Sequence, residues 1–160
     1  MHLFKPTVMK EKLTDITPEL LREMGVSCIL LDVDNTLAAY ESRDPIPQAV
    51  PWTKELQKAG FRMMIVSNNY PRRVAPFAGK FGLEYVTFAC KPLPFGYLKA
   101  RRFFGEAASA CTIVGDQIFT DVVGANLCGM KSILVEPIKY ETTFLFRVRR
   151  DAEQKLKRRY

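Results

Sequence analysis

Histidine is almost missing from this 160-residue chain, because the single one, His2, stands beside the N-terminus. A catalytic triad or a metal centre built on histidine is therefore almost excluded. The cysteines are widely spaced and form no Cys-x-x-Cys pair, which argues against zinc and redox motifs: Cys28, Cys90, Cys111 and Cys128. No apolar run approaches the roughly 18 residues of a membrane-spanning helix, and no apolar signal-peptide segment is visible. These absences predict a cytoplasmic protein.

The chain has the composition of one globular domain, with 48% hydrophobic and 26% charged residues. Its length suffices for one full core and is too short for two ordinary domains. The net charge of +7 is unevenly distributed, because residues 139–160 carry eight basic and three acidic side chains. We therefore expect one domain at residues 1–138, with a leader at 1–16 and a core at 17–138, followed by a basic C-terminal tail at 139–160.

Strand and helix signals alternate through the core. Short apolar runs predict five strands, at residues 26–31, 61–66, 85–89, 111–114 and 131–135. Helix signals, with caps and closing glycines, fall between or before them, at residues 17–25, 52–59, 72–81, 97–104 and 121–128. Pro76 is expected to weaken or kink its helix. This alternation predicts a parallel sheet with helices on both faces.

Polar residues follow four of these strands at the point where each ends. They comprise four carboxylates, a hydroxyl and an ammonium group: Asp32, Asp34, Ser67, Lys91, Asp116 and Asp121. Because the carboxyl ends of parallel strands lie on one edge of a sheet, these side chains should meet in one crevice. Two carboxylates as close as Asp32 and Asp34 favour a cation or a shared proton between them.

Four motifs in this order resemble those of the haloacid-dehalogenase-like (HAD) phosphohydrolase superfamily: Asp32-Val33-Asp34-Asn35-Thr36, Ser67, Lys91, and Gly115-Asp116 with Asp121. The surrounding segments are similar to the YqeG-type, subfamily IIIA branch, whose relatives include phosphatidylglycerophosphate phosphatases. The resemblance implies a three-layer Rossmann-like α/β fold with a five-stranded parallel sheet in the order 5-4-1-2-3. Only a minimal cap fits between the strands, so the site should be open, or be covered by a neighbour in an oligomer.

The resemblance also implies roles for the acidic residues. Asp32 is the expected nucleophile, which forms an aspartyl-phosphate, and Asp34 is the expected general acid and base. Asp32, Asp116 and the backbone carbonyl of Asp34 are the expected ligands of Mg²⁺. Asp121 either supports these ligands from behind or simply faces the dipole of the following helix.

The remaining candidates concern the phosphate group and the rest of the substrate. Ser67, Lys91, Asn68 and Thr36 are expected to contact the phosphoryl oxygens. Three arginines are candidates for contacts at the rim of the site, although surface arginines seldom have such a role: Arg43, Arg72 and Arg73. The expected partner is a phosphorylated substrate, and a phospholipid headgroup is one candidate.

These observations predict a Mg²⁺-dependent phosphomonoester hydrolase, with phosphatidylglycerophosphate as a candidate substrate. The alternative is a nucleic-acid- or ribosome-associated factor that keeps the fold and binds through the basic tail. The tail could contact RNA phosphates or an anionic membrane peripherally, or pack on the domain as a solvated helix. A phospho-accepting receiver domain is disfavoured, because it would place its aspartate after the third strand, where Cys90-Lys91 stands.

Overall fold

The computed structural model describes residues 3–139 and 143–159, so His2 and residues 140–142 of the tail lie outside the described part. Three single-turn helices, at Leu13–Asp15 (η1), Ala108–Ala110 (η2) and Ile118–Val122 (η3, π-helical), supplement the main elements. Those elements run β1 (Val8–Lys10), α1 (Pro18–Glu23), β2 (Cys28–Leu31), α2 (Ala49–Lys58), β3 (Arg62–Val66), α3 (Pro71–Phe81), β4 (Glu84–Val86), α4 (Phe95–Phe104), β5 (Cys111–Gly115), α5 (Val123–Leu127), β6 (Lys131–Val135) and α6 (Phe144–Lys157).

The strands form one parallel sheet in the order β1-β6-β5-β2-β3-β4. The order predicted for five strands is confirmed as β6-β5-β2-β3-β4, but the predicted count was wrong. The additional strand, β1, lies in the leader and pairs with β6, where Val8 is opposite Ile133. Three residues are too few to show an alternating pattern, so only pairing with β6 makes this segment a strand.

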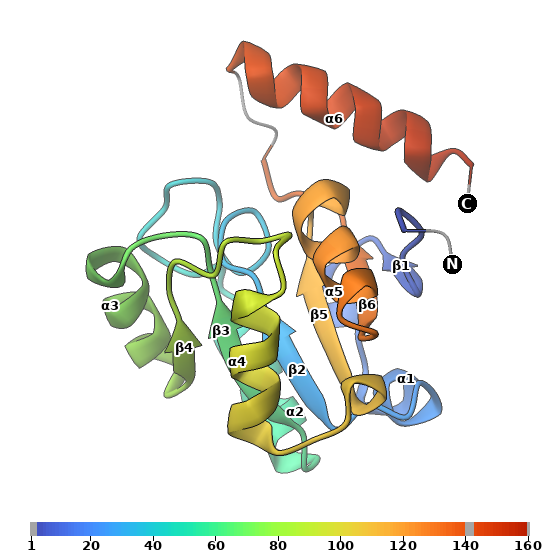
Figure 1. Ribbon diagram of the computed structural model, residues 1–160. Helices are drawn as coiled ribbons and strands as arrows, with labels where there is room; N and C mark the ends of the chain where they lie inside the picture. Colours follow the sequence, from blue (N-terminus) through green and yellow to red (C-terminus); the bar gives the residue numbers. More distant parts are fainter. Residues whose placement is uncertain (1–2, 140–142, 160) are drawn as a thin grey trace.

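Helices cover both faces of the sheet (Figure 1). Alternate residues of the central strand β2 pack in opposite layers. Ile29 and Leu31 of β2 pack in one core with residues of α1, α2 and α3. Leu30 points to the other face and packs with Tyr97 of α4 and Ala125 of α5. This side-chain alternation is the normal consequence of an extended backbone. The buried three-layer core fixes the position of the strand ends that carry the polar residues.

Helix ends follow the sequence signals closely. The Thr17 side chain accepts a hydrogen bond from the backbone N–H of Leu20 and caps α1. Gly82 and Gly105 adopt positive φ at the ends of α3 and α4, a conformation that glycine adopts without strain. Helix α3 continues through Pro76 and is not interrupted there.

Two predicted elements differ in the structure. β4 ends at Val86 rather than at residue 89, because Phe88 and Cys90 adopt positive φ, which is incompatible with an extended strand. The predicted helix at 121–128 is divided into the π-helical turn Ile118–Val122 and the short helix α5. The turn brings Asp121 back toward the sheet instead of leaving it at the N-terminus of a regular helix.

No cap domain is inserted between the strands of the described chain; instead, α6 lies across the edge at which β2 and β5 end (Figure 1). Leu156 of α6 packs against Ile118, Val122 and Leu134. The Phe146 ring contacts Tyr40 edge to face, with centroids 5.5 Å apart. Among the described residues, no helix has both the length and the apolar character needed to cross a membrane.

Candidate active site

The centre of the site lies at the ends of the two central strands, β2 and β5. Leu31 is opposite Val114 in the sheet, and the backbone N–H of Asp32 donates to Val114 O at 3.0 Å. Asp32 and Asp116 therefore follow neighbouring strands at almost the same level. Both are buried, with exposed fractions of 8% and 1%. The sheet register thus places two carboxylates from distant parts of the sequence side by side.

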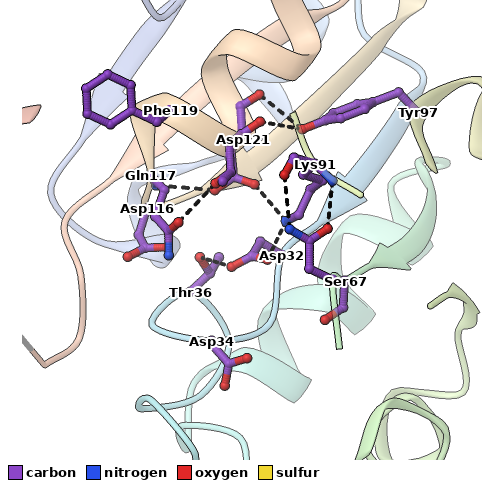
Figure 2. Close-up of polar contacts among 12 residues, drawn as sticks. Asp32, Asp34, Thr36, Ser67, Lys91, Tyr97, Asp116, Gln117, Phe119 and Asp121 are labelled. Atoms are coloured by element: carbon purple, nitrogen blue, oxygen red, sulfur yellow. Dashed lines mark hydrogen bonds and ion pairs between the residues drawn. The ribbon is translucent and has the colours of Figure 1, made fainter. Parts of the chain in front are cut away.

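Lys91 links the acidic residues (Figure 2). Its buried Nζ donates to Asp32 Oδ1 and, at 2.7 Å, to Asp121 Oδ1. Burial alone would lower the pKa of Lys91, but the charges of Asp121 and Asp32 outweigh it and raise that pKa. The side chain therefore remains a cation. Thr36 Oγ1 donates to the other oxygen of Asp32 at 3.4 Å.

Three carboxylates form a set that fits a divalent cation. Oxygens of Asp32, Asp116 and Asp121 lie within 4.8 Å of one another. Burial raises the pKa of Asp32 to about 7 and that of Asp116 well above its ordinary value. Asp116 Oδ1 is buried and accepts no hydrogen bond from the described residues. A hard ion such as Mg²⁺ prefers oxygen ligands of this kind and would relieve their mutual repulsion.

Asp34 does not direct its carboxylate into this set (Figure 2). The side chain accepts from Asn69 Nδ2 at 2.6 Å and forms an ion pair with Arg73. The strand has ended by this point, and Asn35 turns the chain with a positive φ of 63°. The two aspartates therefore do not share a strand face. Asn69 is a contact that the sequence analysis missed.

The remaining phosphate-site candidates lie beside Lys91. Ser67 is buried, and its hydroxyl accepts from the backbone N–H of Asn69 at 3.1 Å. The Asn68 amide bonds to the backbone of Lys91 in both directions, with distances of 2.7 and 3.1 Å. Asn68 thus holds the Lys91 loop in place, whereas Thr36 and Lys91 contact the acidic residues directly.

A basic groove opens beside Asp34. It has a volume of about 600 Å³ and is lined by four cationic and three other side chains: Arg43, Arg72, Arg73, Lys80, Tyr70, Pro76 and Phe77. Arg73 belongs to both this groove and the site, because it pairs with Asp34. The three arginines considered as rim contacts therefore lie together, next to the candidate acid.

Two residues of α6, Arg150 and Glu153, also reach the site and were not anticipated from the sequence. Arg150 pairs with Asp116, and both α6 side chains are buried. In the sequence both residues belong to the basic tail, whose mixture of many basic and a few acidic side chains is the pattern of a solvated helix. Only the tertiary packing of α6 distinguishes these two buried residues from the exposed charged residues of the same helix.

Gly115 is required by the close approach of Asp121. A Cβ at position 115 would lie 2.3 Å from Asp121 Cγ and Oδ2, whereas one at Gly79 would contact nothing within 4 Å. We expect Gly115→Ala to lower the free energy of unfolding by about 1–3 kcal/mol. Gly79→Ala, in the last turn of α3, should instead stabilise the protein by about 0.4–1 kcal/mol. Urea unfolding of both variants tests this, and equal midpoints would contradict the close packing.

Comparison with known proteins identifies relatives of this chain. The family profile of haloacid dehalogenase-like hydrolases matches residues 4–129. The probable phosphatase YqeG of Bacillus subtilis is 34% identical over 153 residues, which cover 96% of this chain and 89% of the relative. Phosphatidylglycerophosphate phosphatase 1 of Arabidopsis thaliana is 26% identical over 97% of this chain, which spans 47% of that protein's length.

The fold is shared with solved structures at much lower identity. The 4-nitrophenylphosphatase of Thermotoga maritima matches with a TM-score of 0.60 at 14% identity, over 76% of this chain and 89% of that one. The family profile spans the strand ends from Asp32 to Asp121, where the acidic set and Lys91 meet. The chain therefore belongs to the haloacid dehalogenase-like hydrolase family, among its YqeG-type phosphatases.

Proposed function

We propose that the protein hydrolyses phosphate monoesters through an aspartyl-phosphate on Asp32, with Mg²⁺ as cofactor. One observation carries the proposal: Asp32 is buried between the cation of Lys91 and the carboxylate of Asp116. A phosphate monoester and a carboxylate repel each other, so a nucleophilic aspartate needs positive charge around it. Lys91 supplies one such charge, and a metal ion held by Asp116 would supply another.

The reaction would proceed in two displacements. A carboxylate oxygen of Asp32 attacks phosphorus, the ester P–O bond breaks, and the leaving oxygen takes a proton from Asp34. Water then attacks the phosphorus of the acyl phosphate and gives a proton to Asp34. The P–O bond to Asp32 breaks, so that inorganic phosphate is released and the Asp32 carboxylate is restored. For both proton transfers Asp34 would turn from Arg73 toward the phosphoryl group. Lys91, Ser67 and Thr36 would bind the phosphoryl oxygens.

The metal ligands would be Asp32, Asp116 and the backbone carbonyl of Asp34, with Asp121 behind them. When bound, Mg²⁺ would supply positive charge that screens the two anionic reactants and polarises the phosphoryl group. Asp121 would remain paired with Lys91, as it is in the structure.

The basic groove supports a substrate that carries a second anionic group. Phosphatidylglycerophosphate has such a group, because its glycerol bears a terminal monoester and an internal phosphodiester. Arg43, Arg72 and Lys80 could bind the diester while the monoester lies at Asp32. The similarity to the Arabidopsis phosphatase points to the same substrate.

The exposed face of α6 is compatible with a lipid substrate. Phe144 and Leu145 are 75% and 76% exposed, and basic side chains follow them on the helix. Apolar and basic groups together favour peripheral contact with an anionic bilayer, at about 1 kcal/mol for each basic side chain near the surface.

We expect Arg72→Gln to raise KM for phosphatidylglycerophosphate by about tenfold and to leave KM for p-nitrophenyl phosphate almost unchanged, because a charged hydrogen bond contributes about 1.5–3 kcal/mol. Steady-state kinetics of both substrates in detergent micelles measures the difference. Arg102→Gln, an exposed arginine of α4 outside the groove, is the matched control. Equal effects of Arg72→Gln on the two substrates would exclude the groove as a binding site for the diester.

The proposed function is tested by release of inorganic phosphate from both substrates, with Mg²⁺ or with EDTA. Turnover that requires Mg²⁺ supports the assignment as a metal-dependent phosphatase. Turnover of p-nitrophenyl phosphate alone would still support the mechanism but would exclude phosphatidylglycerophosphate as the substrate. If neither substrate is hydrolysed, salt-dependent RNA binding that survives Asp32→Asn would support the nucleic-acid-binding alternative instead.

A further inference from the structure

Asp116 uses its two carboxylate oxygens differently. Oδ2 accepts a hydrogen bond from Arg150 Nη2 of α6. Oδ1 is buried and has no hydrogen-bond partner among the residues that the structure describes. A buried carboxylate oxygen without a donor is costly, so this atom is suited to a cation. Asp116 belongs to the set of carboxylates that could hold one.

Arg150 holds both the side chain and the backbone of Asp116. While Nη2 contacts the carboxylate, Nη1 donates to Asp116 O at 3.0 Å. Because the guanidinium group is planar and its donors have fixed directions, these two contacts restrict rotation of the carboxylate. Arg150 itself is buried, with an exposed fraction of 6%.

Glu153, one turn further along α6, orients Arg150. Its Oε2 accepts from Arg150 Nη1 at 3.2 Å, and its Oε1 accepts from the backbone N–H of Phe119 at 3.2 Å. The α6 helix is thus attached to Asp116 and to Phe119, and Phe119 belongs to the π-helical turn that carries Asp121. The Arg150–Glu153 pair is buried, and it contacts the metal-binding set through Asp116 instead of lying on the solvated face of the helix.

We propose that Arg150 is a positioning residue for the metal ligand Asp116, and that α6 is therefore a working part of the active site. By binding Oδ2, Arg150 keeps Oδ1 directed toward the cation. Hydrogen-bonding partners of ligating carboxylates commonly contribute 10- to 100-fold to metal affinity. The inference rests on the proposed metal-dependent function, but it concerns the tail, which the family profile at residues 4–129 does not include.

The opposite role for Arg150 makes a different prediction. If its guanidinium group took the place of the metal, removing it would free Asp116 and strengthen metal binding. If it positions Asp116, removing it lets the carboxylate rotate and weakens metal binding. The sign of the change therefore decides between the two roles.

The test is Mn²⁺ binding to the purified full-length protein, measured by the electron paramagnetic resonance signal of free Mn²⁺. We expect Arg150→Gln to raise the Kd for Mn²⁺ by about 10- to 100-fold, and Arg150→Lys, which keeps the charge but not the paired donors, to have a smaller effect. Arg147→Gln removes the same charge from the exposed face of α6 and should change Kd by less than about twofold.

Each outcome has a defined meaning. Equal or tighter Mn²⁺ binding by Arg150→Gln overturns the positioning role, whereas weaker binding by Arg150→Gln but not by Arg147→Gln supports it. Failure of the wild-type protein to bind Mn²⁺ would contradict the proposed function itself. If circular dichroism shows that Arg150→Gln is unfolded, Glu153→Gln decides, since it keeps the arginine and removes the group that orients it. Weaker binding by that variant supports the inference, and unchanged binding overturns it.

Discussion

Replacement of Asp32 by asparagine is expected to reduce Mg²⁺-dependent phosphate release by roughly 10⁴-fold or more, since loss of a covalent nucleophile removes the reaction path itself. The amide is a poor nucleophile and carries no charge for Lys91 or the metal. Its shape is nearly the same, so the fold should remain. Initial rates with saturating p-nitrophenyl phosphate measure the effect.

Asp151→Asn is the matched control for this variant, because Asp151 is an exposed aspartate on α6. It should retain full activity. Substantial turnover by Asp32→Asn, within about tenfold of the wild type, would show that Asp32 binds the metal without forming a covalent bond.

Replacement of Lys91 by methionine is expected to have the largest effect on stability. Lys91 is the cation that separates two buried carboxylates, Asp32 and Asp121. Removing one partner of a buried ion pair costs about 3–5 kcal/mol, because the remaining charge is left without compensation. Urea unfolding without metal measures the loss, and Lys99→Met, at an exposed position of α4, is the control.

The loss of stability in Lys91→Met should depend on pH in a defined direction. The pKa of Asp32 rises from an ordinary value of 3.8 to about 7 on folding, primarily through burial, while Lys91 opposes this rise. The folded protein therefore binds more protons than the unfolded chain between these values, and the stability from this group falls as pH increases. Without Lys91 the folded pKa would be higher still. The deficit of Lys91→Met should thus be larger near about pH 8 than near about pH 5, and a deficit independent of pH would contradict this account.

The central part of the fold could be predicted from the sequence because its signals are local. The apolar run ending at Leu31 predicts a buried strand, and Asp32 follows it directly. The Lys131–Val135 strand was predicted with its exact bounds. Once strands alternate with helices, parallel pairing follows, and the carboxyl-edge residues Asp32, Lys91, Asp116 and Asp121 must meet.

The parts that were not predicted depend on tertiary contacts. Strand β1 exists because Val8 and its neighbours pair with β6. The direction of the Asp34 side chain depends on Arg73, which lies 39 positions away. Arg150 is one of several arginines in a basic tail, and it contacts Asp116 only because α6 packs against the carboxyl end of β5. None of these contacts has a periodic or short-range pattern.

The most direct test of the proposed mechanism is chemical trapping of the aspartyl-phosphate. Wild-type protein that is turning over p-nitrophenyl phosphate in Mg²⁺ is quenched in acid, treated with borohydride, and digested for peptide mass spectrometry. Reduction of an acyl phosphate converts the aspartate to homoserine. We predict homoserine at position 32 in the wild type, dependent on both substrate and Mg²⁺. Active enzyme with an unmodified Asp32, or with homoserine at another aspartate, would contradict the assignment of Asp32 as the nucleophile.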